Sequence, residues 1–198
     1  MVTEASADTR TRLIDAAVDT FLEYGYAGTR VQDIARRADL TTGAMYAHFE
    51  NKADLLGAAI AERGREALEG AVARIGDDEL GLLGVTVSVD LLTGPLLAFH
   101  RLILEALAVA ARGEESDTLI GPTLELLHEA LQKQAAAGRR AGLIDESITD
   151  EALTGLFERL FLGSIVAKAV TLPALDKRET EHLLATMLSA LPPQEPRG

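Results

Sequence analysis

One short stretch of the chain has small polar residues at its start and aromatic or imidazole rings near its end. It begins with the hydroxyls of Thr41 and Thr42 and ends with the side chains of Tyr46, His48 and Lys52. A threonine hydroxyl can hydrogen-bond to several base edges. Together with the sequence before it, the stretch predicts a very short helix whose first turn is pressed against the major groove of DNA.

A first helix is expected to support this stretch. Asp8 and Thr9 are suitable N-cap residues, and Gly25 can take the left-handed conformation that ends many helices. Between them, apolar residues recur at the spacing of one helix face. The expected inner positions are Leu13, Ala16, Ala17, Phe21 and Tyr24.

A second helix and a tight turn are expected next. Thr29 is typical of an N-cap, and an apolar stripe follows it over residues 31–38. Only Asp39 and Leu40 separate this helix from Thr41, the expected cap of the short third helix. Two helices so closely joined predict a helix-turn-helix, whose second helix enters the groove. The expected core residues of the three helices are Phe21, Ile34, Met45 and Phe49.

The remainder of the chain is expected to be helical. Asn51 and Asp54 resemble a capping box that opens a fourth helix, and a break follows at residues 76–78. Residues 85–89 alternate with period two, as a strand does, but no second strand pattern exists to pair with them. We therefore expect a helix there. Further expected features are helices over residues 95–111 and 116–138, a turn at 142–145, a helix from Thr149 to Pro173, and a last helix capped by Asp176 and Glu179.

These elements predict an all-α fold with two domains. Residues 1–52 would form a three-helix, helix-turn-helix DNA-binding domain, and residues 53–191 a larger helical regulatory domain for ligand binding and dimerisation. A proline-rich tail, residues 192–198, is expected to be disordered. The composition agrees, because the chain is rich in Ala and Leu and has only 4% aromatic residues.

The charge of the chain limits how it can bind DNA. Its formal net charge is −12. Residues 1–52 hold six basic and eight acidic side chains, a net charge of −2, and residues 53–198 hold thirteen and twenty-three, a net charge of −10. Because nucleic-acid binding depends on Lys and Arg, any such binding must rely on a few oriented groups and backbone N–H donors.

Other features restrict the class of protein. The chain has no Cys, which excludes disulfides, thiolate zinc sites and cysteine nucleophiles. The absence of a basic-then-apolar signal pattern favours a cytoplasmic location. The longest weakly charged run, residues 80–99, contains Asp90, three glycines and Pro95, so we expect buried helices there and no membrane span.

A known pattern matches the first quarter of the chain without a gap. The matching residues are Arg12-Leu13-Ile14, Ala16-Ala17, Phe21, Gly25-Tyr26, Thr29, Val31, Ile34-Ala35, Ala38, Leu40-Thr41, Gly43, Met45-Tyr46, His48-Phe49, Lys52 and Leu55-Leu56. In these residues the chain resembles the tetracycline-repressor (TetR) family of DNA-binding regulators. Two positions depart from the family pattern: Asp39 replaces the usual glycine, and Arg30 replaces a small hydroxyl residue. Aspartate tolerates left-handed geometry, so we expect the turn to form.

The resemblance implies a division of roles at the DNA. Thr41 would cap the short helix and leave its early N–H groups for a phosphate. Gly43 would allow close approach, while Thr42 and Ala44 would contact base edges. Contacts to the DNA backbone are expected from Thr29, Arg30, Tyr46, His48 and Lys52, the last by its ammonium or its backbone N–H. The alternatives are an incidental glycine for Gly43, a surface histidine for His48 and a solvated lysine for Lys52.

The resemblance also implies a homodimer that reads a near-palindromic operator. Its interface would lie on the last two helices, where small residues recur at multiples of four on one face. The expected interface residues are Gly155, Phe157, Arg159, Leu160, Gly163, Ala167, Leu184 and Leu188. Ordinary packing within the chain is the alternative.

A pocket for a small inducer is the family's third implied feature. Residues 82–131 are strongly apolar with isolated polar groups, which would suit a hydrophobic or amphipathic ligand. The candidate contacts are His100, Arg101, Glu105 and His128. A core or surface role is the alternative for the histidines, and Arg101 and Glu105, four residues apart, are also placed to pair with each other.

Other function classes are less favoured by the sequence. No Gly-x-Ser-x-Gly elbow or phosphate-binding loop occurs, and Glu125 with His128 supplies only one of the two Glu-x-x-His motifs of a di-iron bundle. We therefore expect no catalytic residue, cofactor or metal. Repression is the usual behaviour of the family; activation, or a helical carrier without DNA function, is the alternative.

Overall fold

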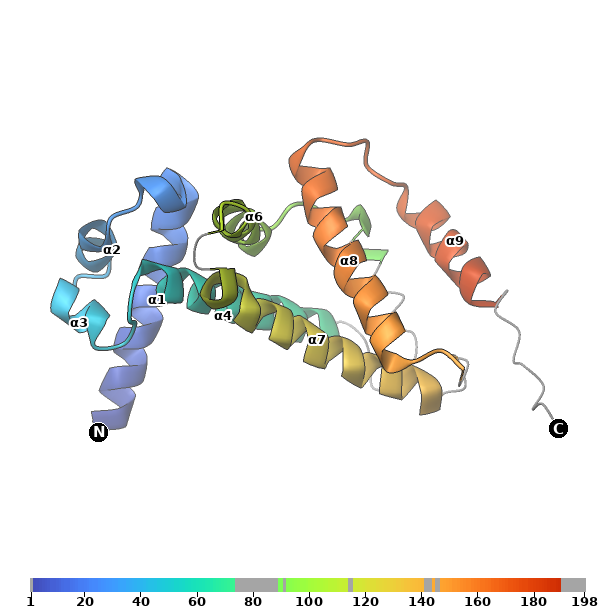
Figure 1. Cartoon of the computed structure of the whole chain (residues 1–198), viewed down its shortest axis with the longest axis horizontal. Helices are drawn as coiled ribbons and strands as arrows, with labels where there is room; N and C mark the ends of the chain where they lie inside the picture. Colours follow the sequence, from blue (N-terminus) through green and yellow to red (C-terminus); the bar gives the residue numbers. More distant parts are fainter. Residues whose placement is uncertain are drawn as a thin grey trace. The chain divides into compact units, whose positions relative to one another are not determined.

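The computed structural model describes residues 2–73, 89–90, 92–113, 116–140, 144 and 147–189. Throughout this described part every regular element is an α-helix, which confirms the predicted all-α class (Figure 1). The helices are α1 (Val2–Gly28), α2 (Val31–Arg37), α3 (Thr42–Tyr46), α4 (Lys52–Ala73), α6 (Ala98–Ala110), α7 (Ser116–Arg140), α8 (Asp150–Ala169) and α9 (Lys177–Ser189).

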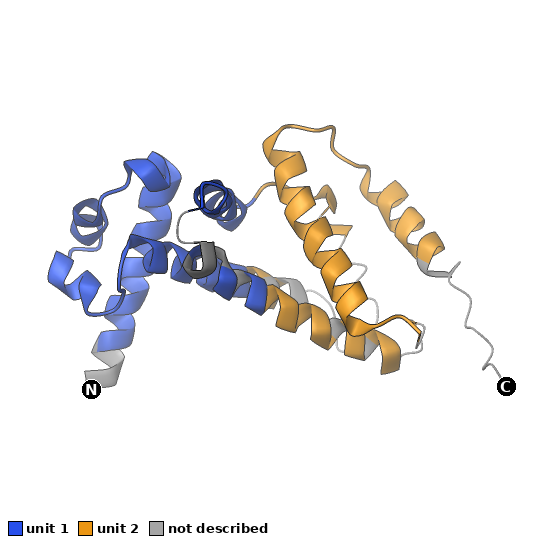
Figure 2. Cartoon of the chain, in the orientation of Figure 1, with its two compact units in different colours: residues 1–66, 97–125 blue, residues 67–96, 126–198 orange. Residues whose placement is uncertain are grey.

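The chain divides into two compact units (Figure 2). Unit 1 comprises residues 1–66 and 97–125, and unit 2 comprises residues 67–96 and 126–198. Unit 1 therefore contains the whole predicted DNA-binding domain and adds α6, which packs on α1. The domain boundaries predicted at residues 52 and 191 stay a prediction.

A small apolar core holds the first three helices together. Phe21, Ile34, Met45 and Phe49 are buried, as predicted, and burial of each such side chain stabilises the fold by about 1.5–3 kcal/mol. The prediction for Tyr24 is wrong, because its side chain is 56% exposed. It lies one residue before a kink, and its hydroxyl bonds to the Glu23 carboxylate instead.

The kink is at Gly25, where the sequence predicted the end of the first helix. Its φ of 68° and ψ of 171° lie in a region that is essentially restricted to glycine. The prediction that Asp8 and Thr9 cap this helix is wrong: α1 begins at Val2, before both residues. Favourable helix formers such as Ala5 and Ala7 extend it towards the N-terminus.

Thr29 does not cap the second helix, contrary to the prediction. The N-cap of α2 is Arg30, whose side chain makes no capping hydrogen bond. The Thr29 side chain is 3% exposed, and its hydroxyl donates to the Gly25 carbonyl at 2.7 Å. This hydrogen bond from the buried hydroxyl therefore closes the turn after the kink.

The turn between α2 and α3 has the geometry that the sequence predicted. Asp39 adopts a φ of 54°, so this aspartate occupies the left-handed position usually held by glycine. Its N–H donates to the Arg36 carbonyl at 3.1 Å, and the Leu40 N–H donates to the Ala35 carbonyl at 2.9 Å, which together form a Schellman motif. Arg12 of α1 secures the turn by donating to the Ala38 carbonyl at 2.7 Å.

The other four predicted helix caps, at Thr41, Asn51, Thr149 and Asp176, are confirmed. Thr41 accepts from the Ala44 N–H, and Thr149 accepts from the Ala152 N–H. Asp176 accepts from the Glu179 N–H, and Asn51 accepts from the Asp54 N–H. The carboxylate of Asp54 completes its box on the Glu50 N–H, one residue before the expected partner.

The end of α8 differs from its prediction. Pro173 was expected to end this helix, but α8 ends at Ala169. Thr171, with a φ of 55°, closes it by donating its N–H to the Lys168 carbonyl, and the Leu172 N–H donates to the Ala167 carbonyl. A left-handed residue thus stops the helix before the proline is reached.

Several predictions lie outside the described residues. These are the break at 76–78, the alternating pattern up to residue 88, most of the turn at 142–145, and the tail at 192–198. Among the helices that the structure does describe, none combines the length and apolar character needed to cross a lipid bilayer.

Candidate nucleic-acid interface

The short helix α3 presents small polar side chains above a buried anchor. Met45 is fully buried beneath it, while Thr42 and Ala44 are half-buried and Gly43 is exposed. A Cβ added at Gly43 would meet only the Thr41 hydroxyl oxygen, at an ordinary 3.7 Å. Internal packing therefore does not require glycine here, and its predicted role in close approach to DNA stays a prediction.

The predicted phosphate-binding side chains lie just after α3. Tyr46 is 57% exposed and His48 is half-buried. The next residue, Phe49, is buried, and its ring lies 6.4 Å from the His48 ring. The core therefore fixes the backbone that carries both polar rings.

A shallow hollow between α2 and α3 adds two residues that the sequence analysis missed. Gln32 and Arg36 lie one helical turn apart on α2 and line this hollow beside Thr41, Thr42 and Ala44. Their four-residue spacing, both on the polar side of a helix that buries Ile34 and Ala35, is the signal that could have identified them.

Lys52 is directed into the protein. Its ammonium donates to the carbonyl of Tyr26 at 2.6 Å and to that of Thr29 at 3.0 Å, and it lies 4.2 Å from the centroid of the Tyr26 ring. Within the protein, this charge stabilises the carbonyls at the end of α1, where a cation is favourable. The Thr29 hydroxyl is buried, and the predicted contacts of Lys52 and Thr29 with the DNA backbone stay predictions.

Both arginines of α2 are paired with carboxylates. Arg36 bonds to Asp33 at 2.7 Å, and Arg37 bonds to Glu23 at 2.5 Å. Hydrogen bonds from Tyr24 and Arg37 lower the pKa of Glu23, and the bond to Glu23 raises the pKa of Arg37. Both members of the Arg37–Glu23 pair therefore stay charged near neutral pH.

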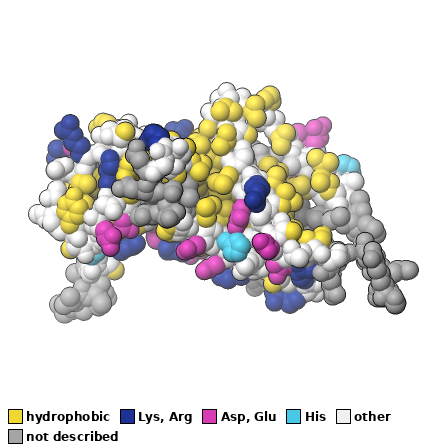
Figure 3. All heavy atoms as spheres, viewed as in Figure 1, with side chains coloured by type: hydrophobic (Ala, Val, Ile, Leu, Met, Phe, Trp, Pro, Cys, Tyr) yellow, Lys and Arg dark blue, Asp and Glu magenta, His cyan; other side chains and the backbone are white. Residues whose placement is uncertain are grey.

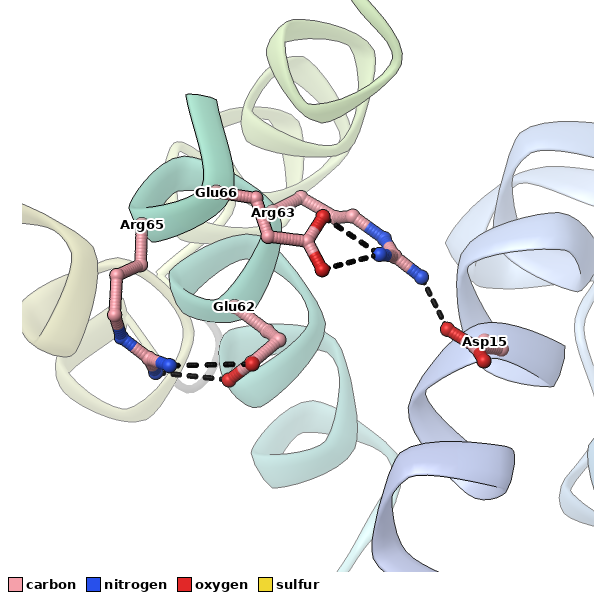
Figure 4. A network of polar contacts seen from close by, with 5 residues as sticks. All are labelled: Asp15, Glu62, Arg63, Arg65 and Glu66. Atoms are coloured by element: carbon pink, nitrogen blue, oxygen red, sulfur yellow. Dashed lines mark hydrogen bonds and ion pairs between the residues drawn. The ribbon is translucent and has the colours of Figure 1, made fainter. Parts of the chain in front are cut away.

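Ion pairs also attach α4 to α1 (Figure 4). Arg63 contacts Asp15 of α1 and bonds to Glu66 at 2.7 Å, and the bond to Glu66 is the main reason that the pKa of Arg63 is raised. Arg65 bonds to Glu62 at 2.8 Å. The Arg63–Asp15 contact therefore links the fourth helix to the first, whereas the Arg65–Glu62 pair lies within α4.

Comparisons with known proteins agree with this geometry. Residues 13–59 match the bacterial regulatory proteins of the tetR family. An uncharacterized HTH-type transcriptional regulator of Mycobacterium tuberculosis is 30% identical over 196 residues, covering 93% of this chain and 92% of that protein. The chain belongs to the TetR family.

Two solved structures show the same fold. A TetR-family transcriptional regulator from Rhodococcus superposes with a TM-score of 0.72 at 18% identity, covering 93% of this chain and 98% of its own. NalD, the secondary repressor of the MexAB-OprM multidrug efflux pump in Pseudomonas aeruginosa, gives a TM-score of 0.57 at 24% identity, covering 93% and 96%. This TetR-family chain is accordingly a DNA-binding transcriptional regulator and not an enzyme.

The candidate ligand contacts of this TetR-family chain belong to different units. His100, Arg101 and Glu105 are in unit 1, whereas His128 is in unit 2. His100 is buried, and its Nδ1 accepts from the Leu97 N–H at 3.1 Å, so it caps its own helix. Glu105 does not pair with Arg101: its carboxylate accepts from the Tyr26 N–H at 2.9 Å.

His128 lies in an open surface hollow of unit 2 that has both polar and apolar lining residues. Its Nδ1 is 2.8 Å from the Glu158 carboxylate, and its Nε2 is 3.0 Å from the Gln132 amide nitrogen. Arg159 and Gly155 of α8 line the same hollow. This hollow is open and has both polar and apolar lining residues, and the predicted inducer pocket stays a prediction.

The predicted interface residues lie on two helices with many exposed apolar side chains. On α8, Leu160 is 39% exposed, Phe157 and Ala167 are half-buried, and a Cβ added at exposed Gly163 would have no neighbour within 4 Å. Arg159 donates to the Gly155 carbonyl at 2.7 Å.

On α9, Leu184 is half-buried, and the side chain of Leu188 is not among those that the structure describes. Further exposed apolar residues are Leu156, Val166, Leu183 and Met187, and Figure 3 shows apolar side chains over these two helices.

Proposed function

We propose that the chain is a ligand-responsive repressor, acting in the cytoplasm. It would bind a palindromic operator as a homodimer and leave it when a small hydrophobic or amphipathic molecule binds. The observation that carries the proposal is the arrangement at α3. A capped helix, anchored by buried Met45, offers Thr42, Gly43 and Ala44 to the outside.

The roles proposed at the DNA follow from side-chain size and exposure. Thr42 and Ala44 would contact base edges, because a hydroxyl hydrogen-bonds to them and a methyl group packs on thymine. Exposed Tyr46 and neighbouring His48 would bind phosphates. Such contacts fix the position of α3 on the DNA but do not distinguish one base sequence from another. The hollow lined by Gln32 and Arg36 lies on the same surface and would face the same groove.

Homodimerisation is supported by the apolar surface of α8 and α9. Leu156, Leu183 and Met187 are each more than half exposed, which is unusual for so many large apolar side chains on one pair of helices. A single α3 covers only a few base pairs, and a two-fold dimer would double that site. Repression is supported by the fold shared with NalD, which is a repressor.

Selection from random duplex DNA tests the proposal. The full-length chain should enrich a near-palindrome, and Thr42→Ala should change the enriched bases. Tyr46→Phe should weaken binding to every sequence by a similar factor. A reporter transcribed from the enriched operator should be repressed by the chain, and a hydrophobic metabolite should relieve this repression.

Each alternative predicts a different result in the same experiments. A higher reporter output with the chain present would identify an activator. No enrichment of any duplex, together with tight binding of a small apolar molecule, would identify a carrier without DNA function.

A further inference from the structure

Most basic side chains in residues 1–52 make hydrogen bonds or ion pairs within the protein. Of the six basic side chains in residues 1–52, four have such contacts. Arg12 donates to the turn after α2, Lys52 to the end of α1, Arg36 to Asp33 and Arg37 to Glu23. Arg36 and Arg37 are therefore paired with carboxylates, and the donors of Arg12 and Lys52 are engaged by backbone carbonyls.

Arg10 and Arg30 complete the six. Neither has an acidic partner among the residues that the structure describes, and both are exposed. Arg30 stands at the start of α2 and is already a proposed backbone contact. Arg10, on the exposed side of α1, has no role in the arrangement described above.

Arg10 is held beside the end of α3. Its guanidinium carbon lies 5.3 Å from the centroid of the Phe49 ring, within the range of a cation–π contact. Phe49 is 3% exposed and directly follows His48, so the ring is a rigid support next to a proposed phosphate-binding residue. A cation–π contact uses none of the five N–H donors of a guanidinium, so these stay available for a phosphate.

We propose that Arg10 binds a DNA phosphate beside His48 and is oriented for this by the Phe49 ring. The inference rests on the proposed DNA-binding function and extends the interface from α2 and α3 to α1. An arginine suits this position because its planar donors match phosphate oxygens in pairs. In a domain with a net charge of −2, one oriented cation without an acidic partner carries a large share of the attraction.

The salt dependence of DNA binding tests the role of Arg10. Each phosphate contact contributes about 0.9 to the slope of log K against log salt concentration, so a dimer that loses two contacts should lose about 1.8. Arg10→Gln should reduce affinity for the selected operator roughly tenfold or more at low salt, with unchanged base preference. Arg10→Lys keeps the charge and should retain most of the slope.

Arg65→Gln is the matched control. It removes the same charge from the same unit, at a residue paired with Glu62 (Figure 4). Arg65 lies about 20 Å along α4 from Lys52, given the helix rise of about 1.5 Å per residue. Its slope should equal that of the wild type. Thermal unfolding of each variant, followed by circular dichroism, checks that the fold is retained.

The outcomes separate this inference from the proposed function. A wild-type slope in folded Arg10→Gln overturns the role of Arg10 while leaving DNA binding intact. An equal loss in Arg65→Gln overturns it too, because the effect would then be one of net charge. A changed base preference in Arg10→Gln would make Arg10 a base reader and would also contradict the proposal. A wild-type chain that binds no duplex overturns the proposed function itself, and this inference with it.

Discussion

The kink at Gly25 sets the direction of the chain into α2, and Gly25→Ala should disrupt it. The backbone there has a φ of 68° and a ψ of 171°. A residue with a Cβ is strained in this region by about 1–3 kcal/mol. The added Cβ would also lie 3.3 Å from a carboxylate oxygen of Glu105, the same oxygen that accepts from the Tyr26 N–H.

The magnitude follows from three contributions. Backbone strain costs about 2 kcal/mol, and displacing the Glu105 carboxylate weakens a charged hydrogen bond whose full value is about 1.5–3 kcal/mol. Alanine restricts the unfolded chain, which offsets about 0.4–1 kcal/mol. We therefore expect Gly25→Ala to lower the free energy of unfolding by about 2–3 kcal/mol.

Urea denaturation followed by far-ultraviolet circular dichroism measures this change, with Gly28→Ala as the control. Gly28 is also near the end of α1, but a Cβ there would meet only the Tyr24 Cβ at an ordinary 3.5 Å. Gly28→Ala should be neutral or stabilising by up to about 1 kcal/mol. Equal midpoints for the two variants, at equal slopes, would refute the assignment of strain to Gly25.

Three further predictions concern Lys52, Tyr46 and the proposed dimer interface. Lys52→Met keeps most of the aliphatic stem but removes the ammonium from the Tyr26 carbonyl, so the free energy of unfolding in urea should fall by about 1.5–3 kcal/mol. Unchanged stability together with weaker DNA binding would instead support a phosphate contact by Lys52. Tyr46→Phe should lower affinity equally for several operators in fluorescence anisotropy, and a changed ranking of operators would contradict a phosphate contact. Gly163→Glu should dissociate the proposed dimer in sedimentation experiments without unfolding the chain, since the added Cβ has room in one protomer; a dimer that persists in this variant would exclude this face as the interface.

Features determined by neighbouring residues were predicted well from the sequence. The caps at Thr41, Thr149 and Asp176 depend on one side chain and an N–H three residues later. The core residues Phe21 and Met45 follow from helical periodicity. In such cases the local chain contains both partners of the interaction, so the pattern suffices.

Contacts between distant residues were not predictable in the same way. Glu105 and Tyr26 are 79 positions apart, and Lys52 and Tyr26 are 26 apart. Sequence spacing pairs Glu105 with Arg101, and residue type alone directs Lys52 to solvent or to a phosphate. Burial of Thr29 was missed for a related reason: a threonine before a helix suits an N-cap, and only the kink at Gly25 brings a carbonyl within reach of its hydroxyl.

The hydrogen bonds of the Tyr26 peptide groups link the orientation of α2 and α3 to residues outside the first three helices. The Tyr26 N–H is bound by Glu105 of α6, and its carbonyl is bound by Lys52 at the start of α4. Both contacts hold the segment that leads from the kink into α2, and α2 in turn carries the turn to α3. A fragment ending at residue 52 would keep the lysine and lose the carboxylate. The orientation of α2, and therefore of Thr42 and Ala44, is consequently set in part by α6, which lies far along the sequence from the residues proposed to read DNA.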